Sequence, residues 1–397
     1  MNNLSALITE LCPNGVEYKE LQAVLKIKNG SDYKSFGEGD IPVYGSGGII
    51  AHTNRFAYDK PSVLIPRKGS VDKLYYVDVP FWNVDTIFYT EINTGLVIPR
   101  YVYHCLLREH LEKLNTAGGV PSLTQNVLNK VKIPVPPLEV QREIVRILDT
   151  FTELTTELTT ELTARRQQYE YYRNKLLSIG NNPTPILELR DIVKKSCSGA
   201  TPVKSNDEYY ENGIIPWIRT QDVRFNEITE VDSYITEKAV NETAAKWIPE
   251  NCVIVAISGA TAGRCAINKI KATTNQHCLN LIIDDSKALY RYVFHCLCSK
   301  YDELISRKQG ARGDLNSSLI LSLPIPVPSL PVQQRIVTVL DNFDAICTDL
   351  NIGLPAEIEA RKKQYEFYRD QLLAFAAQDE IVLTDRQTDR QTDRQTD

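Results

Sequence analysis

The feature that most limits how this chain can fold is that it is written twice. Three motifs of the first half return in the same order in the second half, at offsets of 191, 192 and 196 residues. The pairs are PRYVYHCL (99–106) with YRYVFHCL (290–297), IPVPPLEVQREIVRILDTF (133–151) with IPVPSLPVQQRIVTVLDNF (325–343), and ARRQQYEYYRNKLL (164–177) with ARKKQYEFYRDQLL (360–373). Chance does not produce three ordered matches of this quality, so the chain is a tandem duplication of a unit of about 190 residues.

The first part of each unit, 16–132 and 185–324, is predicted to be a globular domain built around a sheet. Short β-branched and aromatic runs alternate there with Gly, Pro and Asn, which is typical of a mixed, largely antiparallel sheet. The clearest strand candidates are SVLIPRKG (62–69), KLYYVDV (73–79), TIFYTEI (86–92) and CVIVAISG (252–259). Two helices are predicted within these domains, RYVYHCLLREHLEKL (100–114) and RYVFHCLCSKYDELI (291–305).

The second part of each unit is predicted to be a long helix. Its apolar residues recur at steps of three, four or seven, which makes a seam that another helix must cover. The first seam comprises Ile144, Leu148, Phe151, Leu154, Leu158, Leu162, Tyr169, Tyr172 and Leu176; the second comprises Ile336, Leu340, Phe343, Ile346, Leu350, Ile358, Tyr365, Tyr368 and Leu372. From Glu139 to Ser178 the first helix would be about 60 Å long. The IPVPP run before it cannot be helical, and Gly353 and Pro355 should break or kink the second helix.

Two like units, each with one long apolar seam, predict that the two long helices cover each other. The predicted fold class is therefore α+β, a tandem duplication of a mixed α/β globular domain followed by a long helix, with the helices forming an antiparallel coiled coil of pseudo-two-fold symmetry. The expected divisions are 1–132 (an N-terminal helix and the first globular domain), 133–180 (the first long helix), 181–324 (the second globular domain), 325–378 (the second long helix) and 379–397 (a low-complexity tail).

Composition limits the class of protein more than it indicates a partner. Hydrophobic residues make up 43% and charged residues 24% of the 397 residues, which is typical of globular proteins. The net charge of −5 comes from residues 325–397, which carry 8 basic and 13 acidic side chains, whereas 16–132 carry 14 and 12 and 185–324 carry 17 of each. Charge alone therefore gives no evidence for DNA. Nine cysteines without paired spacing, no long apolar run and no signal-peptide pattern favour a cytoplasmic protein without a membrane segment.

The repeated motifs resemble those of a known family, the specificity subunits (HsdS) of type I restriction–modification systems, over about residues 1–378. The IPVP-x4-Q-x3-IV-x-(I/V)LD-x-F run followed by QYE-(Y/F)-YR-x2-LL, present twice, carries most of the resemblance. The stretch SGATPVKSNDEYYENGIIPWI (198–218) is similar to the start of many target-recognition domains of this family. Another type of that domain resembles IPVYGSGGIIAHTN (41–54), VLIPRKGSVDK (63–73) and FWNVDT (81–86).

The resemblance implies a DNA-binding protein that is not itself an enzyme. Each globular part would be a target-recognition domain that recognises one half of a split site on double-stranded DNA. The paired helices would fix the gap between the halves and bind two methyltransferase subunits. Those partners methylate adenine at N6 with S-adenosylmethionine, and restriction (motor-nuclease) subunits cleave DNA with ATP and Mg. No cofactor or metal would be held by this chain.

Two short repeats lead to two separate hypotheses. Residues 152–163 consist of TELT three times. One such unit lengthens a helix by about 6 Å and turns it by about 40°, whereas one base pair rises about 3.4 Å and turns about 36°. We therefore predict that the number of TELT units sets the spacer of the DNA site, the alternative being a plain solvated helix. The tail TDRQTDRQTDRQTD (384–397) is what a repeated ACAG tract encodes, which suggests phase variation by frame shifting.

Motifs for catalysis or metal binding are not found in the sequence. There is no phosphate loop and no adenine-methyltransferase motif, and the glycine-rich GSGG (45–48) is interpreted as a turn. His104–Cys105 and His295–Cys296 are metal-ligand types, but adjacent helix residues point about 100° apart, which favours core packing. The tyrosines of QYEYYR and QYEFYR are assigned to the seam or to partner docking and not to base stacking.

Candidate DNA contacts are polar residues on loops, because base edges are recognised by Arg, Lys, Asn, Gln, Ser and Thr. In the first domain they are Ser46, His52, Asn54, Arg55, Arg67, Lys68, Ser70 and Lys73; in the second they are Arg219, Gln221, Ser258, Thr261, Arg264, Asn275, Gln276, Arg307, Lys308 and Arg312. Each could equally be an ordinary surface or turn residue. Arg67 and Lys68 are the strongest candidates, because they follow an apolar strand and precede a glycine.

Two other functions fit the same architecture. The chain could be a bipartite DNA-binding regulator without a methyltransferase partner, or a coiled-coil scaffold whose globular parts bind protein. A methyltransferase gene next door would argue against the regulator, and failure to bind any DNA would favour the scaffold.

Overall fold

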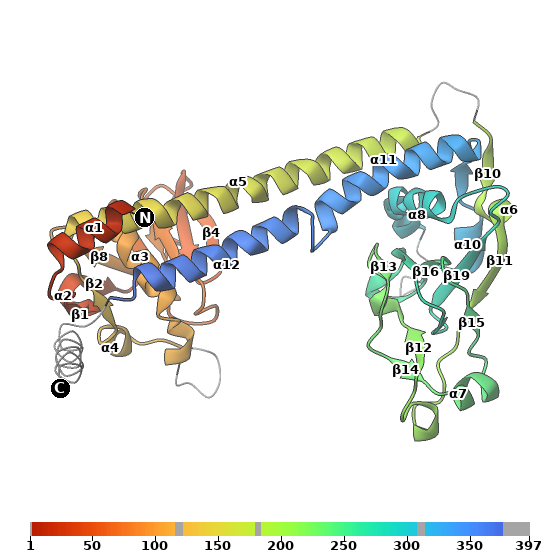
Figure 1. The fold of residues 1–397 in the computed structure, drawn as a ribbon, viewed down its shortest axis with the longest axis horizontal. Coiled ribbons are helices and arrows are strands. Elements are labelled where there is room, and N and C mark those ends of the chain that lie inside the picture. Colours follow the sequence, from red (N-terminus) through yellow and green to blue (C-terminus); the bar gives the residue numbers. More distant parts are fainter. Residues whose placement is uncertain (1, 116–121, 179–183, 308–313, 376–397) are drawn as a thin grey trace, which may run out of the picture. The chain divides into compact units, whose positions relative to one another are not determined.

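The computed structural model describes residues 2–115, 122–178, 184–307 and 314–375, and these form two units (Figure 1). Unit 1 comprises residues up to 158 together with those from 357 onward, and unit 2 comprises 159–356. Each unit therefore contains one sheet-rich domain and one part of the long helix α5 (Leu138–Leu177). Each also contains a helical segment from the end of the second repeat, so both units combine residues of the two repeats. The predicted fold class is confirmed.

The domain of unit 1 is built from two small sheets and a two-stranded ribbon. The first sheet has the order β2-β8-β5-β6, the second has the order β4-β3-β7, and the ribbon pairs β1 with β9. All these pairs are antiparallel except β3–β7. The strands are β1 (Tyr18–Glu20), β2 (Leu25–Lys28), β3 (Ile41–Gly45), β4 (Gly48–Thr53), β5 (Ser62–Pro66), β6 (Tyr75–Val77), β7 (Trp82–Asn83), β8 (Ile87–Ile92) and β9 (Lys132–Pro134).

The domain of unit 2 has the same plan with additional strands. Its sheets have the orders β11-β19-β16-β17-β13 and β14-β12-β18-β15, and its ribbon pairs β10 with β20. The strands are β10 (Ile186–Glu188), β11 (Val193–Ser198), β12 (Ile215–Ile218), β13 (Glu227–Ile228), β14 (Tyr234–Ile235), β15 (Trp247–Ile248), β16 (Val253–Ala256), β17 (Cys265–Asn268), β18 (Ala272–Thr274), β19 (Cys278–Ile283) and β20 (Pro324–Pro326). The parallel pair β12–β18 occupies the place of β3–β7. The two domains thus share one strand order, although their sequences are not recognisably similar.

Short helices pack beside these sheets. They are α1 (Asn2–Leu11), α2 (Leu21–Val24), α3 (Pro99–Arg108) and α4 (Gln125–Leu128) in unit 1, and α6 (Leu189–Ile192), α7 (Glu237–Glu242), α8 (Tyr290–Ser299), α9 (Tyr301–Ser306) and α10 (Ser317–Leu321) in unit 2. The helices predicted over 100–114 and 291–305 are each interrupted. His110 adopts a left-handed φ of 48° after α3 ends, and the second helix breaks at Lys300, between α8 and α9.

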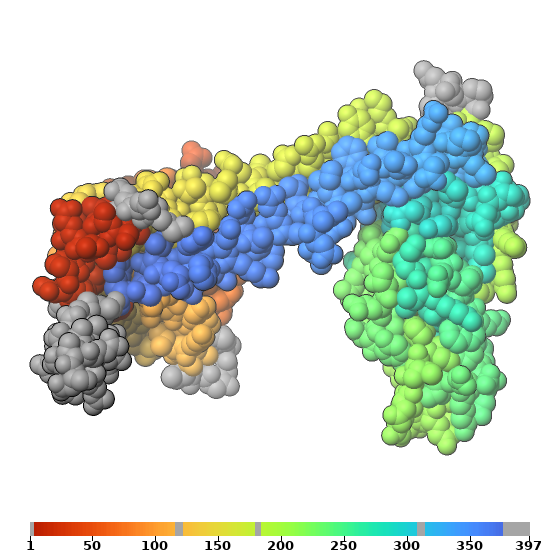
Figure 2. All heavy atoms as spheres, in the orientation of Figure 1, coloured from red at the N-terminus to blue at the C-terminus, as the bar shows by residue number. Residues whose placement is uncertain are grey.

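The long helices cover each other as the apolar seams predict. In unit 1, α12 (Leu354–Leu372) runs antiparallel to α5, and Phe151 stacks on Tyr368 with ring centroids 5.2 Å apart. Figure 2 shows α12 lying directly against α5 on one face of unit 1. In unit 2, α11 (Leu330–Thr348) is the partner of α5, and Tyr172 stacks on Phe343 at 5.7 Å.

The predicted break at Gly353 is confirmed, but several predicted seam residues are exposed, among them Leu154 (39%), Leu176 (36%) and Ile346 (43%) on the helices, and Leu350 in the break. The chain leaves helical geometry between α11 and α12, and a Cβ on Gly353 would lie 2.6 Å from the carbonyl oxygens of Ala345 and Asp349, so only glycine fits there. Pro355 follows in the first turn of α12, where its missing N–H is not needed. Leu350, predicted to be in the seam, lies in this break and is 78% exposed, because the helix ends before its position can face α5.

No helix among the described residues is long and apolar enough to cross a membrane.

Candidate DNA interface

Three loops of unit 1 meet at one edge of its domain. They follow β3 (45–47), follow β5 (67–70) and connect β7 to β8 (84–86), and Thr86 joins them. Its carbonyl oxygen accepts hydrogen bonds from the N–H groups of Arg67 (2.8 Å) and Lys68 (3.3 Å), and its Oγ1 accepts one from the N–H of Ser46 (3.3 Å). We call these three loops the loop edge of unit 1.

The corresponding loops of unit 2 meet in the same way. They are 219–221 after β12, 257–260 after β16 and 275–277 between β18 and β19, and we call them the loop edge of unit 2. The N–H of Asn275 donates to the carbonyl oxygen of Ile218 (3.0 Å), and the N–H of Ile257 donates to that of His277 (2.9 Å). In unit 1 the first of these bonds corresponds to Val84 N–H donating to the Tyr44 carbonyl (3.0 Å).

A glycine fixes the same turn in both loop edges. Gly69 has a φ of 80° and Gly259 a φ of 73°, a left-handed conformation that glycine adopts without steric cost. Lys68 precedes the first glycine and Ser258 the second. The backbone frame is therefore repeated in the two units, whereas the side chains that it carries differ.

Several predicted DNA-contact residues gather at the two loop edges. In unit 1 they are Ser46, Arg67, Lys68 and Ser70, with Lys73 next to them; in unit 2 they are Arg219, Gln221, Ser258, Asn275 and Gln276, with Thr261 and Arg264 in the following turn. Most are exposed or half-buried. Asn275 differs, because it is buried and its Oδ1 accepts the N–H of His277 (3.1 Å), which shapes the loop.

The arginines of the loop edges rest on aromatic rings. The Arg67 guanidinium lies 5.7 Å from the ring centroid of Phe88, and that of Arg219 lies 6.0 Å from Trp217. Among the described residues, the buried Nε atoms of Arg219 and Arg264 have no hydrogen-bond partner. A buried N–H without a partner costs free energy, so both loops carry an unsatisfied polar group.

The other predicted residues lie away from the loop edges. His52, Asn54 and Arg55 lie at or beyond the end of β4, about four strand residues or 13 Å from the β3–β4 turn. There the Arg55 guanidinium lies 5.1 Å from the ring of Phe36. Arg307 ends α9 and pairs with Glu303 on the same helix. Lys308 and Arg312 lie outside the described residues.

A polar network that the sequence analysis did not predict ties the domain of unit 1 to its long helices. His104 on α3 is fully buried, its Nε2 is 3.0 Å from Asp149 Oδ1 on α5, and its Nδ1 is 2.8 Å from Tyr365 Oη on α12. Arg100 Nε donates to the same carboxylate at 2.8 Å. Tyr365 belongs to the opposite repeat, so each copy of the duplication completes the network of the other.

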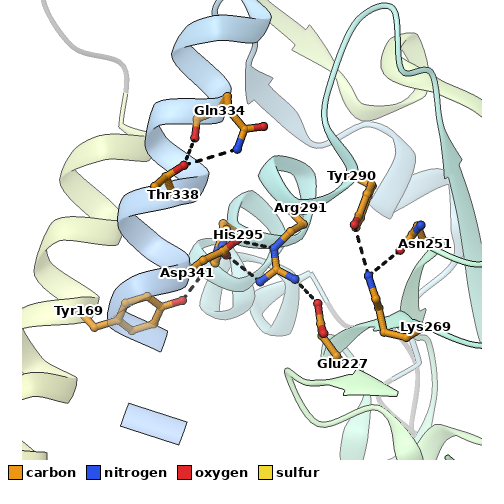
Figure 3. A network of polar contacts seen from close by, with 10 residues as sticks. All are labelled: Tyr169, Glu227, Asn251, Lys269, Tyr290, Arg291, His295, Gln334, Thr338 and Asp341. Atoms are coloured by element: carbon orange, nitrogen blue, oxygen red, sulfur yellow. Dashed lines mark hydrogen bonds and ion pairs between the residues drawn. The ribbon is translucent and has the colours of Figure 1, made fainter. Parts of the chain in front are cut away.

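The same network recurs in unit 2 (Figure 3). His295 Nε2 is 2.8 Å from Asp341 Oδ1, and its Nδ1 is 3.4 Å from Tyr169 Oη on α5. Arg291 donates to both oxygens of Asp341 at 2.6 and 2.7 Å and also pairs with Glu227. The repeated RYV-(Y/F)-HCL, LD-x-F and QYE motifs are thus explained, because they supply the arginine, histidine, carboxylate and tyrosine of each network.

Burial and hydrogen bonding set the charges of the first network. Burial lowers the pKa of His104 more than its bond to Asp149 raises it, so the ring is held neutral. Burial alone would raise the pKa of Asp149, but the hydrogen bonds from His104 and Arg100 reverse this and hold the carboxyl pKa below its usual range. The network is therefore a neutral histidine between an ionised carboxylate and a tyrosine hydroxyl.

A buried glutamine at the start of each long helix adds a second tie. Gln141 accepts the N–H of Ile98, which precedes α3, and donates to the carbonyls of Leu96 and Pro136 at 2.9 and 2.8 Å. Gln333 makes the equivalent bonds before α8. These contacts explain the glutamine of the repeated IPVP-x4-Q motif.

Nothing in the described ranges resembles a metal centre, since no group of three His, Cys, Asp or Glu side chains is placed to hold an ion. Cys105 and Cys296 are buried, and burial raises the pKa of both thiols. They are core residues, as predicted, whereas the neighbouring histidines also carry the networks described above.

Comparison with known proteins agrees with this architecture. Residues 13–165 and 185–360 match the family described as type I restriction modification DNA specificity domain. The chain belongs to the specificity subunits of type I restriction–modification systems. It is 38% identical over 306 residues to the EcoR124I/EcoR124II specificity subunit of Escherichia coli, covering 74% of each chain. A putative type I specificity subunit of Haemophilus influenzae is 29% identical over 94% of this chain and all of its own.

Solved structures show the same fold at low sequence identity. The S subunit of a type I system from M. genitalium aligns over 90% of this chain and 96% of its own with a TM-score of 0.57 and 16% identity. A chain from a structure of type I restriction–modification complex assembly aligns over 90% and 97% with a TM-score of 0.61. As a type I specificity subunit, the chain is the DNA-recognition component and is not itself catalytic; catalysis in such systems lies in partner subunits.

Proposed function

We propose that this specificity subunit recognises a bipartite DNA site, with the loop edge of unit 1 on one half-site and that of unit 2 on the other. The observation that carries the proposal is the repetition of one backbone frame with different side chains. Arg67 and Lys68 stand where unit 2 has Ile257 and Ser258. Two copies of one frame suit two segments of the same duplex, and different side chains suit different base sequences.

The duplicated helices would hold the two loop edges at a fixed separation and bind the partner subunits. In support, the networks of His104 and His295 and the clamps of Gln141 and Gln333 fasten each domain to its long helices. Apolar residues also remain exposed along those helices, as a surface that other subunits could cover. They include Leu154, Leu176, Val332, Val339 and Ile346.

The expected partners follow from the family. Two methyltransferase subunits would modify adenine at N6 with S-adenosylmethionine, and restriction subunits would add ATP-dependent, Mg-requiring cleavage. This chain would supply the sequence specificity for both reactions and would hold none of these cofactors itself.

A methylome tests the proposal. The chain is co-expressed with its neighbouring methyltransferase in a host without DNA methylation, and N6-methyladenine is mapped by long-read sequencing. The expected result is one split motif with a fixed gap. A test variant carries Lys68→Ala and Arg219→Ala together. We expect it to assemble as the wild type does and to methylate the motif more weakly or to methylate an altered motif. A soluble assembled complex that methylates no defined motif would contradict the proposal and favour the regulator or scaffold.

A further inference from the structure

Two exposed isoleucines lie at the start of β4, directly after the first loop of the loop edge of unit 1. Ile49 is 54% exposed and Ile50 is 53% exposed, although both lie in a β-strand. Their strand, β4, is the last strand of its sheet and pairs only with β3 among the described residues. Large apolar side chains at such a position lose contact with water when a partner covers them.

A β-bulge brings these two side chains to the loop edge. Val43 pairs with Ala51, but the next residue, Tyr44, pairs with Ile49. Ile50 is therefore an extra residue of β4 that has no pairing partner of its own on β3. Bulges of this kind redirect a side chain and are frequent next to functional sites. A Cβ on Gly45 would lie 3.3 Å from Ile50 Cγ2 and 3.7 Å from Thr86 Oγ1. Ile50 therefore packs over the first loop of the edge, beside the residue that joins all three loops.

The chemistry of DNA indicates what these isoleucines contact. In the major groove the only apolar group on a base edge is the C5 methyl of thymine, and a two-stranded β-ribbon fits into that groove. We propose that Ile49 and Ile50 recognise the methyl group of a thymine in the half-site of unit 1, an inference that rests on the proposed DNA-recognition function. The polar neighbours Ser46, Arg67 and Lys68 then contact the adjoining base edges and phosphates.

Unit 2 provides an internal contrast. The strand that pairs with β12 as β4 pairs with β3 is β14, where Ile235 is buried and Tyr234, 43% exposed, pairs with Pro216, two residues before the end of β12. No exposed isoleucine of β14 therefore lies beside the loop edge of unit 2. Ile214, just before β12, is 74% exposed but lies at the other end of that strand from the loop edge. It is therefore a matched control for an exposed isoleucine.

Replacing thymine with deoxyuridine tests the inference, because it removes only the methyl group. Duplexes carrying the motif from the methylome are made with one thymine replaced at a time, and their affinity for the assembled methyltransferase complex is measured by competition. For at least one thymine, the wild-type complex should bind the uracil duplex about fourfold more weakly, which corresponds to about 0.8 kcal/mol for one buried methyl group. In Ile49→Ala/Ile50→Ala the same replacement should have no effect, and in Ile214→Ala the fourfold loss should remain.

Each other outcome counts against a different statement. If wild type and Ile49→Ala/Ile50→Ala respond alike to every uracil replacement, the methyl contact is refuted while the split motif still stands. If the double variant loses its methyltransferase but its uracil response is unchanged, the isoleucines serve a protein partner and the inference is again refuted. If the wild-type complex has no split motif, the proposed function fails and this inference fails with it.

Discussion

The network at His104 predicts how firmly unit 1 holds its domain against the long helices. Changing Tyr365 to Phe removes one oxygen and leaves His104 Nδ1 without its 2.8 Å partner. His104 is fully buried, so water does not replace the lost bond. Leaving a buried polar group unpaired costs about 1–3 kcal/mol, which raises the population of the opened state about 5- to 150-fold.

Unit 2 supplies the control for this change. Tyr169→Phe removes the equivalent hydroxyl, but its distance to His295 Nδ1 is 3.4 Å. A bond at this limit is weak, so we expect a loss of at most about 0.5 kcal/mol. The asymmetry between the two changes therefore follows from a difference of distance in otherwise equivalent networks.

Hydrogen exchange measured by mass spectrometry gives the opening free energy of each network separately. Peptides covering α3 report on unit 1 and peptides covering α8 report on unit 2. Tyr365→Phe should accelerate exchange in α3 and leave α8 unchanged. Equal effects of the two substitutions on their own helices, or no effect of Tyr365→Phe on α3, would refute the assignment of the His104–Tyr365 contact as a stabilising bond.

Three further predictions concern pH, the TELT repeats and the glutamine clamp. Because the pKa values of His104 and Asp149 are both lower in the folded state, the stability that they contribute is present above their unfolded values, and unit 1 should lose stability as pH falls below about 6.5 and again below about 3.8. Thermal melts from about pH 2 to pH 8 check this, and the absence of both declines would contradict the network. Deleting one TELT unit from 152–163 should shorten the gap of the methylated motif and leave both half-sites unchanged, since α5 is continuous there and loses about 6 Å; an altered half-site in the methylome would contradict this. Gln141→Leu should destabilise unit 1 by about 2–4 kcal/mol, because the Ile98 N–H and two carbonyls lose their partner in the core; Arg142→Ala, at an exposed neighbour, should change its melting temperature little.

Much of the candidate site could be located from sequence, but its assembly could not. Lys68 and Arg67 were predicted from a strand followed by glycine, and both lie in the loop edge. His52 and Arg55 were predicted by the same kind of argument, yet they lie at the far end of the hairpin. Residue type and turn position do not reveal which loops meet, because that depends on strand pairing between distant segments. The half-buried Asp149 gave no separate signal beyond its place in a repeated motif.

The sequence by itself determined the duplication, the strands β5, β6, β8 and β16, the long helices and the break at Gly353. These are local or periodic properties, since helix seams follow residue spacing and glycine and proline act on their own backbone. Only the tertiary structure revealed that the two dissimilar domains share one strand order and that Tyr365 completes a network with His104, 261 residues away. The physical reason is that strand register and buried hydrogen bonds are set by which surfaces exclude water together, and a linear pattern does not specify those pairs.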